Sequence, residues 1–316
     1  MIRTKPEINF KFARGGAPLY ALILILLVHT SLDAQELEPR ALTNVPVGTN
    51  FAVMGYGYAN GNILFDPALP LEDVNATTHV LVGAWVRSYN FFGLGAKSSV
   101  VLPFATGNWT GIYQGDDAYV SRTGIADLKL GFSFNFVGSP AVNKSQFSSY
   151  EQKTIAGFSF QMAAPTGQYF EDRFINLGSN RWAFRPQLDV SHKLGTWYLE
   201  YALNIWLYTT NSAFWDGNTL KQNPIGTIKM NLIKSFNRGI WAAVGAGYAF
   251  GGRAYVNDMQ RDATISTMRF GAIVSVPLHP QHSLKLAVIL ARRFAEGADF
   301  NSVSLAYQFL WNRTKL

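Results

Sequence analysis

The segment "ADLKLGFSFNF", residues 126–136, alternates polar and apolar side chains without interruption. One set of alternate positions holds Asp127, Lys129, Gly131, Ser133 and Asn135, and the other holds Leu128, Leu130, Phe132, Phe134 and Phe136. A period of two predicts a β-strand with one polar and one apolar face. The polar face carries too much charge for an ordinary core, so the surroundings of the two faces decide the fold.

The same alternation recurs along the chain, which predicts about twelve strands, with ten or fourteen as open alternatives. Each predicted strand is near or above the roughly 9–11 residues that a tilted strand needs to cross a membrane. The predicted strands are Thr49–Asn60, Thr77–Asn90, Ala96–Thr106, Ile125–Val137, Gln152–Pro165, Arg181–Lys193, Thr196–Thr210, Pro224–Ser235, Ile240–Gly251, Thr264–Val276, Ser283–Arg293 and Asn301–Trp311.

The connections between these strands alternate between long and short. Long ones follow the odd-numbered strands, for example "GNWTGIYQGDDAYVSRTG" at 107–124, and short ones such as "LG" at 194–195 follow most of the even ones. This is the pattern of outer-membrane barrels, which have short periplasmic turns and longer outer loops. The connection at 138–151 is long for a periplasmic turn, and we expect a short helix in it.

The N-terminal residues 1–34 are typical of a signal peptide. A basic segment precedes the apolar run "PLYALILILLV" at 18–28, and "SLDA" ends on Ala34. The run is too short to span a bilayer comfortably. We therefore expect cleavage after Ala34 and a mature barrel domain at 35–316, with an N-terminal membrane anchor as the alternative.

Composition excludes several classes of protein. The chain has no cysteine, which excludes disulfides, thiol catalysis and cysteine-ligated metals. The net charge of +7 reflects in part the basic N-terminus. The sequence has no basic stripe with interleaved aromatic residues, the pattern that would indicate nucleic-acid binding. The glycine-rich strings lack the spacing of a dinucleotide motif, and we expect no cofactor. A soluble β-sandwich would also alternate, but long strands with aromatic ends favour a closed transmembrane barrel.

In such a barrel the apolar set faces lipid and the polar set faces the lumen. By this parity we predict twelve lumen-lining residues: Asp127, Lys129, Arg181, Arg185, Gln187, Asp189, Glu200, Asn204, Lys229, Asn231, Arg269 and Lys285. They could pair across strands and fill the barrel, or they could line a pore that selects solutes by charge and size. Their mixed signs argue against strong selectivity for cations or anions.

An outer-membrane lipid-modifying enzyme is a rival interpretation. Of the histidines, the strand order places His192, His279 and His282 at the periplasmic end and only His79 near the outer rim. Ser121 or Thr123 could approach His79, but no nucleophile motif surrounds them. The acidic pairs at 72–73 and 116–117 could bind Ca²⁺ or meet divalent-bridged lipopolysaccharide, although isolated pairs are more often solvated, and we predict no metal site.

Several phrases of the sequence resemble a known family. They are "PVGTNF" at 46–51, "DPALPLEDV" at 66–74, "LPFATGNWTG" at 102–111, "SRTGIADLKLGFSFN" at 121–135, "APTGQY" at 164–169, "INLGSNRWAFRPQLDVSHKLGTWYLE" at 175–200, "HSLKLAV" at 282–288 and "SLAYQF" at 304–309. Together they resemble the bacterial outer-membrane family named for the MetA-pathway of phenol degradation. The resemblance implies an outer-membrane barrel that passes aromatic or other small hydrophobic compounds.

We therefore expect a passive outer-membrane conduit for small, aromatic or hydrophobic solutes, with both termini in the periplasm. Its expected partners are outer-membrane lipid, lipopolysaccharide and the small-molecule solute. Residues 35–48 are too few for a plug domain, but they could fold into the lumen. The alternatives are a structural barrel with a closed lumen and, less favoured, a lipid-modifying enzyme.

Overall fold

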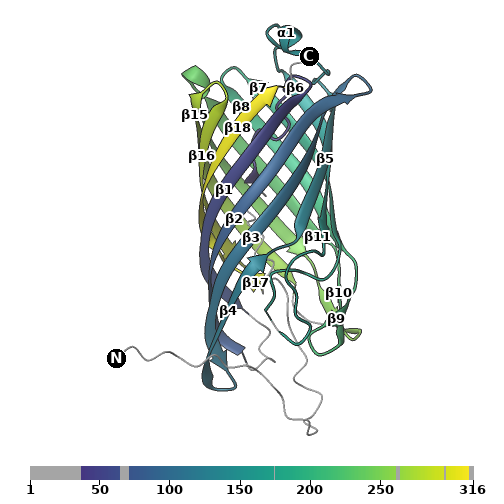
Figure 1. The fold of residues 1–316 in the computed structure, drawn as a ribbon, viewed down its shortest axis with the longest axis vertical. Coiled ribbons are helices and arrows are strands. Elements are labelled where there is room, and N and C mark those ends of the chain that lie inside the picture. Colours follow the sequence, from purple (N-terminus) through teal and green to yellow (C-terminus); the bar gives the residue numbers. More distant parts are fainter. Residues whose placement is uncertain (1–36, 65–70, 174, 261–263, 295–296, 313–316) are drawn as a thin grey trace, which may run out of the picture.

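A single antiparallel sheet curls into a closed barrel (Figure 1). The structure, a computed structural model, describes residues 37–64, 71–173, 175–260, 264–294 and 297–312. The predicted signal peptide at 1–34 lies outside these ranges. Within them, no helix has the length and apolar character that crossing a membrane would require.

Twelve strands make the wall of the barrel. The sheet closes because β1 pairs with both β2 and β18, and β4 and β5 count as one wall strand because both pair with β3. The predicted all-β transmembrane barrel of about twelve strands is confirmed. The wall elements are β1 (Thr49–Leu64), β2 (Leu71–Phe91), β3 (Leu94–Tyr113), β4 (Asp116–Ile125), β5 (Leu128–Val137), β6 (Thr154–Ala164), β7 (Ala183–Leu194), β8 (Trp197–Tyr208), β11 (Ile225–Ser235), β12 (Trp241–Gly251), β15 (Ile265–His279), β16 (His282–Arg293) and β18 (Asn301–Asn312).

The two ends of the barrel differ. At one end, here called the turn end, the connections at 92–93, 195–196, 236–240 and 280–281 are short, and 236–240 contains the 3₁₀ helix η2 (Asn237–Gly239). The turn end also carries α1 (Lys144–Phe147), the short helix expected in the connection at 138–151 (Figure 1). The opposite end, here called the loop end, carries the connections that follow β1, β3, β6, β8, β12 and β16.

The outer face of the wall is apolar, as the alternation predicts. On β8, Leu203 is 56% exposed, whereas its neighbours Ala202 and Asn204 are only 9% and 8% exposed. On β5, the phenylalanines of segment 126–136 pack against other phenylalanine rings. The ring centre of Phe134 lies 5.5 Å from that of Phe91 and 5.9 Å from that of Phe158. Aromatic rings gathered at one level of a barrel are typical of the membrane interface.

The hairpin of β3 and β4 differs from the sequence prediction. Residues 107–124 were expected to form a long loop, but both strands continue through them and meet in the two-residue turn Gln114–Gly115. Both turn residues have positive φ, 53° and 88°, which suits a tight hairpin turn. Strands β1, β2 and β3 are therefore longer than predicted. A strand segment outside the lipid needs no apolar face, so its sequence lacks the alternation that predicts a strand and resembles a loop.

The wall strand formed by β4 and β5 is broken at Ala126–Asp127. Strand β5 pairs with β6, but β4 pairs only with β3. Residues 165–182, which connect β6 to β7, lie along the other edge of β4. The Gln168 amide donates to the Ile125 carbonyl at 2.8 Å, and Arg122 Nε donates to the Ile175 carbonyl at 2.8 Å. This connection takes the place of a strand at the loop end.

Four short strands form a second sheet at the loop end, where the sequence predicted only loops. They are β9 (Asn211–Phe214), β10 (Asn218–Gln222), β13 (Ala254–Val256) and β14 (Met259–Gln260), in the order β14-β13-β10-β9. Another short element, β17 (Gly297–Ala298), pairs with the end of β1.

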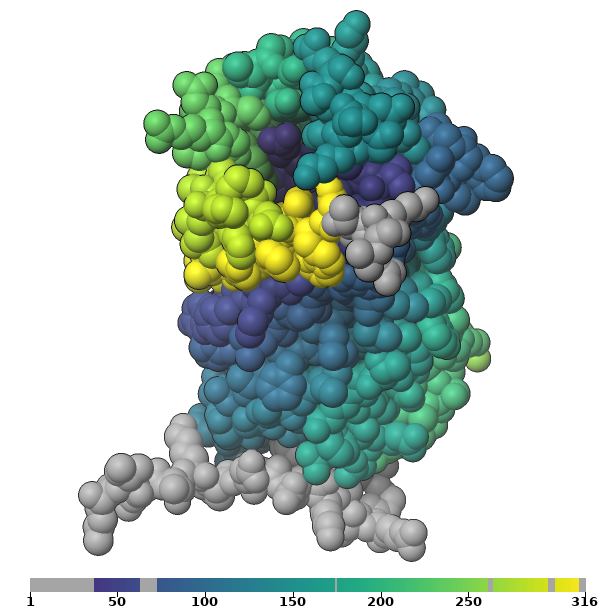
Figure 2. Space-filling model, turned by 45° about the horizontal axis from the view of Figure 1, so that its top comes forward, coloured from purple at the N-terminus to yellow at the C-terminus, as the bar shows by residue number. Residues whose placement is uncertain are grey.

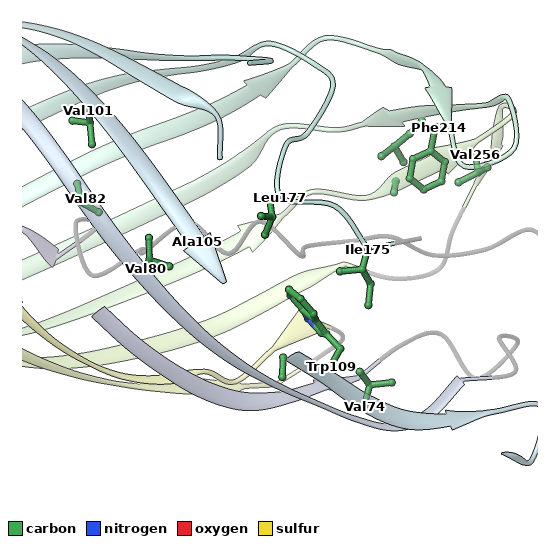
Figure 3. Packing of buried hydrophobic residues seen from close by; sticks show 13 residues of the cluster. Val74, Val80, Val82, Val101, Ala105, Trp109, Ile175, Leu177, Phe214 and Val256 are labelled. Atoms are coloured by element: carbon green, nitrogen blue, oxygen red, sulfur yellow. The ribbon is translucent and has the colours of Figure 1, made fainter. Parts of the chain in front are cut away.

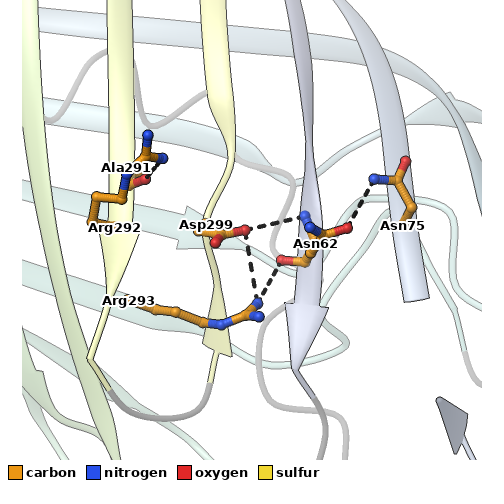
Figure 4. Close-up of polar contacts among 6 residues, drawn as sticks. All are labelled: Asn62, Asn75, Ala291, Arg292, Arg293 and Asp299. Carbon is orange, nitrogen blue, oxygen red and sulfur yellow. Dashed lines mark hydrogen bonds and ion pairs between the residues drawn. The ribbon is translucent and has the colours of Figure 1, made fainter. Parts of the chain in front are cut away.

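Polar contacts at the loop end join the first strand to the last strands of the chain, where β1 and β18 close the barrel (Figure 4). Arg293 of β16 lies 3.7 Å from the Asp299 carboxylate and donates to the Asn62 carbonyl of β1 at 3.1 Å. The Asn62 amide in turn donates to Asp299 at 3.2 Å. The last strands of the chain are thus joined to the first one by side chains as well as by the β1–β18 ladder.

Candidate functional site: the lumen of the barrel

Residues 37–48, here called the strap, cross the inside of the barrel before β1 begins. The Arg40 amide donates to Glu200 of β8 at 2.8 Å, and Glu38 pairs with Lys285 of β16. On another side of the barrel, Lys97 Nζ of β3 donates to the carbonyls of residues 41 and 43, each at 2.8 Å. Because β3, β8 and β16 are well separated in the strand order, the strap must span the lumen. Figure 2 shows this purple segment within the hollow at the turn end.

Glycines in the wall make room for the strap. A Cβ atom on Gly271 of β15 would lie 2.9 Å from Leu37, and one on Gly247 of β12 would lie 3.2 Å from it. Across the lumen, a Cβ atom on Gly157 of β6 would lie 2.9 Å from Leu42. Both leucines are buried, Leu37 to 1% exposure and Leu42 to 5%. The strap is therefore fitted to the wall by shape as well as by hydrogen bonds.

Arg40 anchors the middle of the strap. Its guanidinium carbon lies 5.1 Å from the ring centre of Tyr198 and 5.9 Å from that of Trp241. Stacking on aromatic faces is a favourable place for an arginine in a partly desolvated site. Its Nη1 is also 3.5 Å from the Ser235 hydroxyl. These contacts come from the turn-end parts of β8, β11 and β12.

Further toward the loop end, polar side chains of β7, β8 and β11 form a connected network. Gln187 is at its centre: its amide nitrogen donates to Asp189 at 2.6 Å, and its oxygen accepts from Asn204 and from Lys229, each at 3.1 Å. Asp189 also accepts from the Ser159 hydroxyl at 3.1 Å. Gln187 and Lys229 lie on strands that do not touch each other, which is possible only across the concave inner face of the sheet.

A ladder of arginines and aromatic rings continues from this network. Arg185 lies over Trp206 at 5.0 Å, Arg181 lies over Tyr208 at 4.3 Å, and the two rings are 6.3 Å apart with an interplanar angle of 9°. Arg181 Nη2 donates to Gln222 at 2.6 Å. Burial lowers the pKa of the Arg181 guanidinium to about 10, and the nearby Tyr208 and Asp127 oppose this shift. Arg181 therefore keeps its positive charge at neutral pH.

The wall made by β2 and β3 presents apolar side chains instead. Val80, Val82, Val101 and Ala105 are buried, with at most 9% exposure. They belong to a cluster that continues to the loop end, where it includes Trp109, side chains of the 165–182 connection such as Ile175, and side chains of the second sheet such as Phe214 (Figure 3). The inner face is thus divided into a polar side on β7, β8 and β11 and an apolar side on β2 and β3.

The other predicted residues lie in different surroundings. Asp127 is at the break between β4 and β5, where its carboxylate accepts from the amides of Gly167 and Ser179, both at 2.9 Å, and from the Ser179 hydroxyl. It holds the 165–182 connection in place. Lys129 lies on β5 between Val101 and Ala163, and Arg269 lies on β15 between Gly247 and Ala291.

Asn231 of β11 is 7% exposed, and its Oδ1 occupies the space beside Gly245. Glu200 and Lys285 hold the strap, as described above. Sequence reasoning missed Lys97, although its parity with Val101 on the same strand places both on one face. Whether these twelve residues line a solute path stays a prediction.

In the described part of the chain, neither Ser121 nor Thr123 is hydrogen-bonded to His79. His79 Nδ1 is 2.7 Å from the Tyr56 hydroxyl, whereas Thr123 is hydrogen-bonded to Thr106 at 2.8 Å. At the turn end, His192 is paired with the Thr154 hydroxyl. No group of three or more His, Asp or Glu side chains within the described ranges could hold a metal ion.

The closed antiparallel wall, its apolar outer face and its polar inner network define a transmembrane β-barrel of the outer-membrane type. The chain belongs to the family described as "Putative MetA-pathway of phenol degradation", whose model matches residues 50–309. No curated protein matches the chain.

Two solved structures show how far the fold is shared. One is the COG4313 outer membrane channel from Pseudomonas putida F1, with a TM-score of 0.71, 21% identity, and coverage of 87% of this chain and 99% of that one. The other is the β domain of the Bordetella autotransporter BrkA, with a TM-score of 0.51, 12% identity, and coverage of 84% and 100%. At these identities the similarity shows the fold alone.

Proposed function

We propose that this protein is a passive outer-membrane channel for small aromatic or hydrophobic compounds. In this proposal the loop end faces outward, the turn end faces the periplasm, and both termini of the mature chain are periplasmic. The orientation is supported by the contrast between the short connections at one end and the longer ones at the other. The mature chain would begin near Gln35, so that the strap would lie close to its N-terminus.

The two-sided inner wall is the observation that carries the proposal. A small aromatic solute has an apolar ring and often a hydroxyl or carboxylate substituent. The apolar side on β2 and β3 suits the ring, and the polar side carries the amides of Gln187 and Asn204 and the ammonium group of Lys229, linked in the inner network. Trp206 and Tyr208 add ring faces beside two positive charges. The Pseudomonas relative, described as an outer membrane channel, is consistent with this assignment.

A structural barrel with a closed lumen is the second candidate, and the strap favours it. A segment bound to β3, β6, β8, β15 and β16 fills part of the cross-section at the turn end. The two candidates differ in whether solutes pass while the strap is in place.

Uptake into liposomes separates the candidates. The purified full chain is reconstituted, and entry of phenol, benzoate and glucose is compared with entry into empty liposomes. We expect phenol and benzoate to enter faster through the protein than glucose does. Equal entry with and without protein would refute the channel and support the structural barrel. Lipid hydrolysis that is lost on His79→Ala would instead support an enzyme.

A further inference from the structure

On the outer face of β1–β4, side-chain chemistry changes abruptly from one row of residues to the next. Strand pairing places Tyr56, Leu81, Phe104 and Ile125 side by side in one row across the four strands. All four point away from the barrel, with exposures between 43% and 47%. This row is the last one of the lipid-facing surface on these strands.

The next row toward the loop end is entirely polar. It consists of Tyr58, His79, Thr106 and Thr123, which face one another across the same four strands. Two further rows follow at the same spacing, Asn60–Thr77–Asn108–Ser121 and Asn62–Asn75–Thr110–Tyr119. These three rows are here called the polar face. Its positions hold amide, hydroxyl and imidazole groups and no Asp, Glu, Lys or Arg.

Hydrogen bonds within the polar face hold its amides in fixed orientations. Asn60 Nδ2 donates to Asn75 Oδ1 at 3.1 Å and to the Thr77 hydroxyl at 2.8 Å. The Tyr119 hydroxyl donates to Asn108 Oδ1 at 2.7 Å. Asn75 donates to Asn62 Oδ1 at 3.0 Å, as Figure 4 shows. A rigid array of neutral donors and acceptors suits ligands that carry many hydroxyl groups.

The position of the polar face next to the apolar surface, together with its lack of charge, points to its ligand. Rows on one face of a strand are about 6.7 Å apart and strands about 4.8 Å apart, so the polar face measures roughly 14 Å in each direction. It begins one row beyond the apolar surface, and we place the change from acyl chains to head groups between these two rows. In the orientation proposed above, this is the sugar region of the outer leaflet. Phosphate groups would call for Lys or Arg, which the positions of the polar face lack, and Arg293, which contacts Asn62 at its edge, is already paired with Asp299.

We propose that the outer face of β1–β4 binds the sugar head group of the outer-leaflet glycolipid, lipopolysaccharide, through neutral hydrogen bonds. This proposal rests on the proposed orientation of the barrel but not on transport. It concerns the outside of the wall, so the uptake experiment and the binding experiment fail independently.

Binding of purified lipopolysaccharide to the full chain in detergent tests the proposal. Folded barrels migrate differently on a gel before and after heating, and the temperature of this conversion rises when a ligand binds the folded form. The test variant is Thr77→Val, Thr106→Val and Thr123→Val together, which keeps β-branched residues in the strands. The control is Ser266→Val on β15, an outward hydroxyl that is hydrogen-bonded to Tyr248 and separated from β1 by β16 and β18.

We expect lipopolysaccharide to raise the conversion temperature of the wild type and of Ser266→Val. The triple variant should fold to the same heat-modifiable band and should need at least about tenfold more lipopolysaccharide, because it loses three hydroxyl groups. Equal titrations for the triple variant and the control would overturn the proposal. A response that disappears on chelation of Mg²⁺ would also overturn it, because binding would then depend on bridged phosphates.

Discussion

Filling the pocket of Leu37 should release the strap without changing the strap itself. The pocket exists because residues 247 and 271 are glycines, and a Cβ atom on either would approach Leu37 to 3.2 or 2.9 Å. Valine at both positions adds two further methyl groups on each side. We therefore expect Gly247→Val with Gly271→Val to expel the Leu37 side chain.

The expected size of the effect follows from the burial of Leu37. Its side chain is 1% exposed in the strap's bound position. Burying a leucine side chain contributes about 1.5–3 kcal/mol. Because each 1.4 kcal/mol or so corresponds to a factor of ten, the ratio of released to bound strap should rise about tenfold to a hundredfold. The contacts of Arg40 and Glu38 remain and limit the change to this range.

Single-channel conductance in planar bilayers measures this ratio as the fraction of time spent in the more conducting state. The control is Gly83→Val, since a Cβ atom on Gly83 would meet nothing within 4 Å. Adding Leu37→Ala to the double variant should restore part of the wild-type behaviour, because a smaller side chain fits the filled pocket. If the double variant folds to the same heat-modifiable band and conducts like wild type and Gly83→Val, the strap does not restrict the lumen.

Three other changes have defined outcomes. Asp127→Ala removes hydrogen bonds to a charged acceptor, at about 1.5–3 kcal/mol each, and should therefore speed proteolysis within residues 165–182. The control Asp172→Ala, at an exposed position in the same connection, should leave the rate of proteolysis unchanged. Lys229→Met removes a buried positive charge from the inner network and should shift the reversal potential in a salt gradient toward cation selectivity. An unchanged reversal potential would place Lys229 away from the ion path. Mass spectrometry of the mature protein should find a chain that starts at Gln35, and peptides containing Met1 would disprove cleavage.

Much of the wall could be predicted from the sequence because the membrane imposes a strict rule. Where a strand crosses lipid, every second side chain must be apolar, and segments such as 197–208 show this directly. The rule ends where lipid ends. Residues 107–124 keep their strand pairing, but the outward positions hold Asn108, Thr110 and Ser121, so that the segment resembles a loop. The second sheet at the loop end was not predicted, because its short strands also lie where the lipid rule does not apply.

The strap could not be placed by any local pattern. Its partners are far away in the chain: Arg40 and Glu200 are separated by 160 residues, and Lys285 and Glu38 by 247. Segment 37–48 has no periodicity of its own, and its position depends on the shape of a lumen that several later strands create. Parity alone did place Gln187, Asn204 and Lys229 on one face, because it requires only the strand that carries each residue. It could not show that Asp127 would leave the wall and bind the 165–182 connection.

The position of the strap also bears on the assembly of the barrel. The strap precedes β1, yet its partners include β8, β15 and β16, and β1 must finally pair with β18 to close the wall. The strap's contacts can therefore form while the sheet is still curling, and they hold distant strands toward one another before the last strand arrives. Closure of the β1–β18 pairing is then favoured by contacts that the strap has already made. Variants that weaken the strap's contacts should for this reason also change the rate at which the barrel closes, even when the finished wall is unaltered.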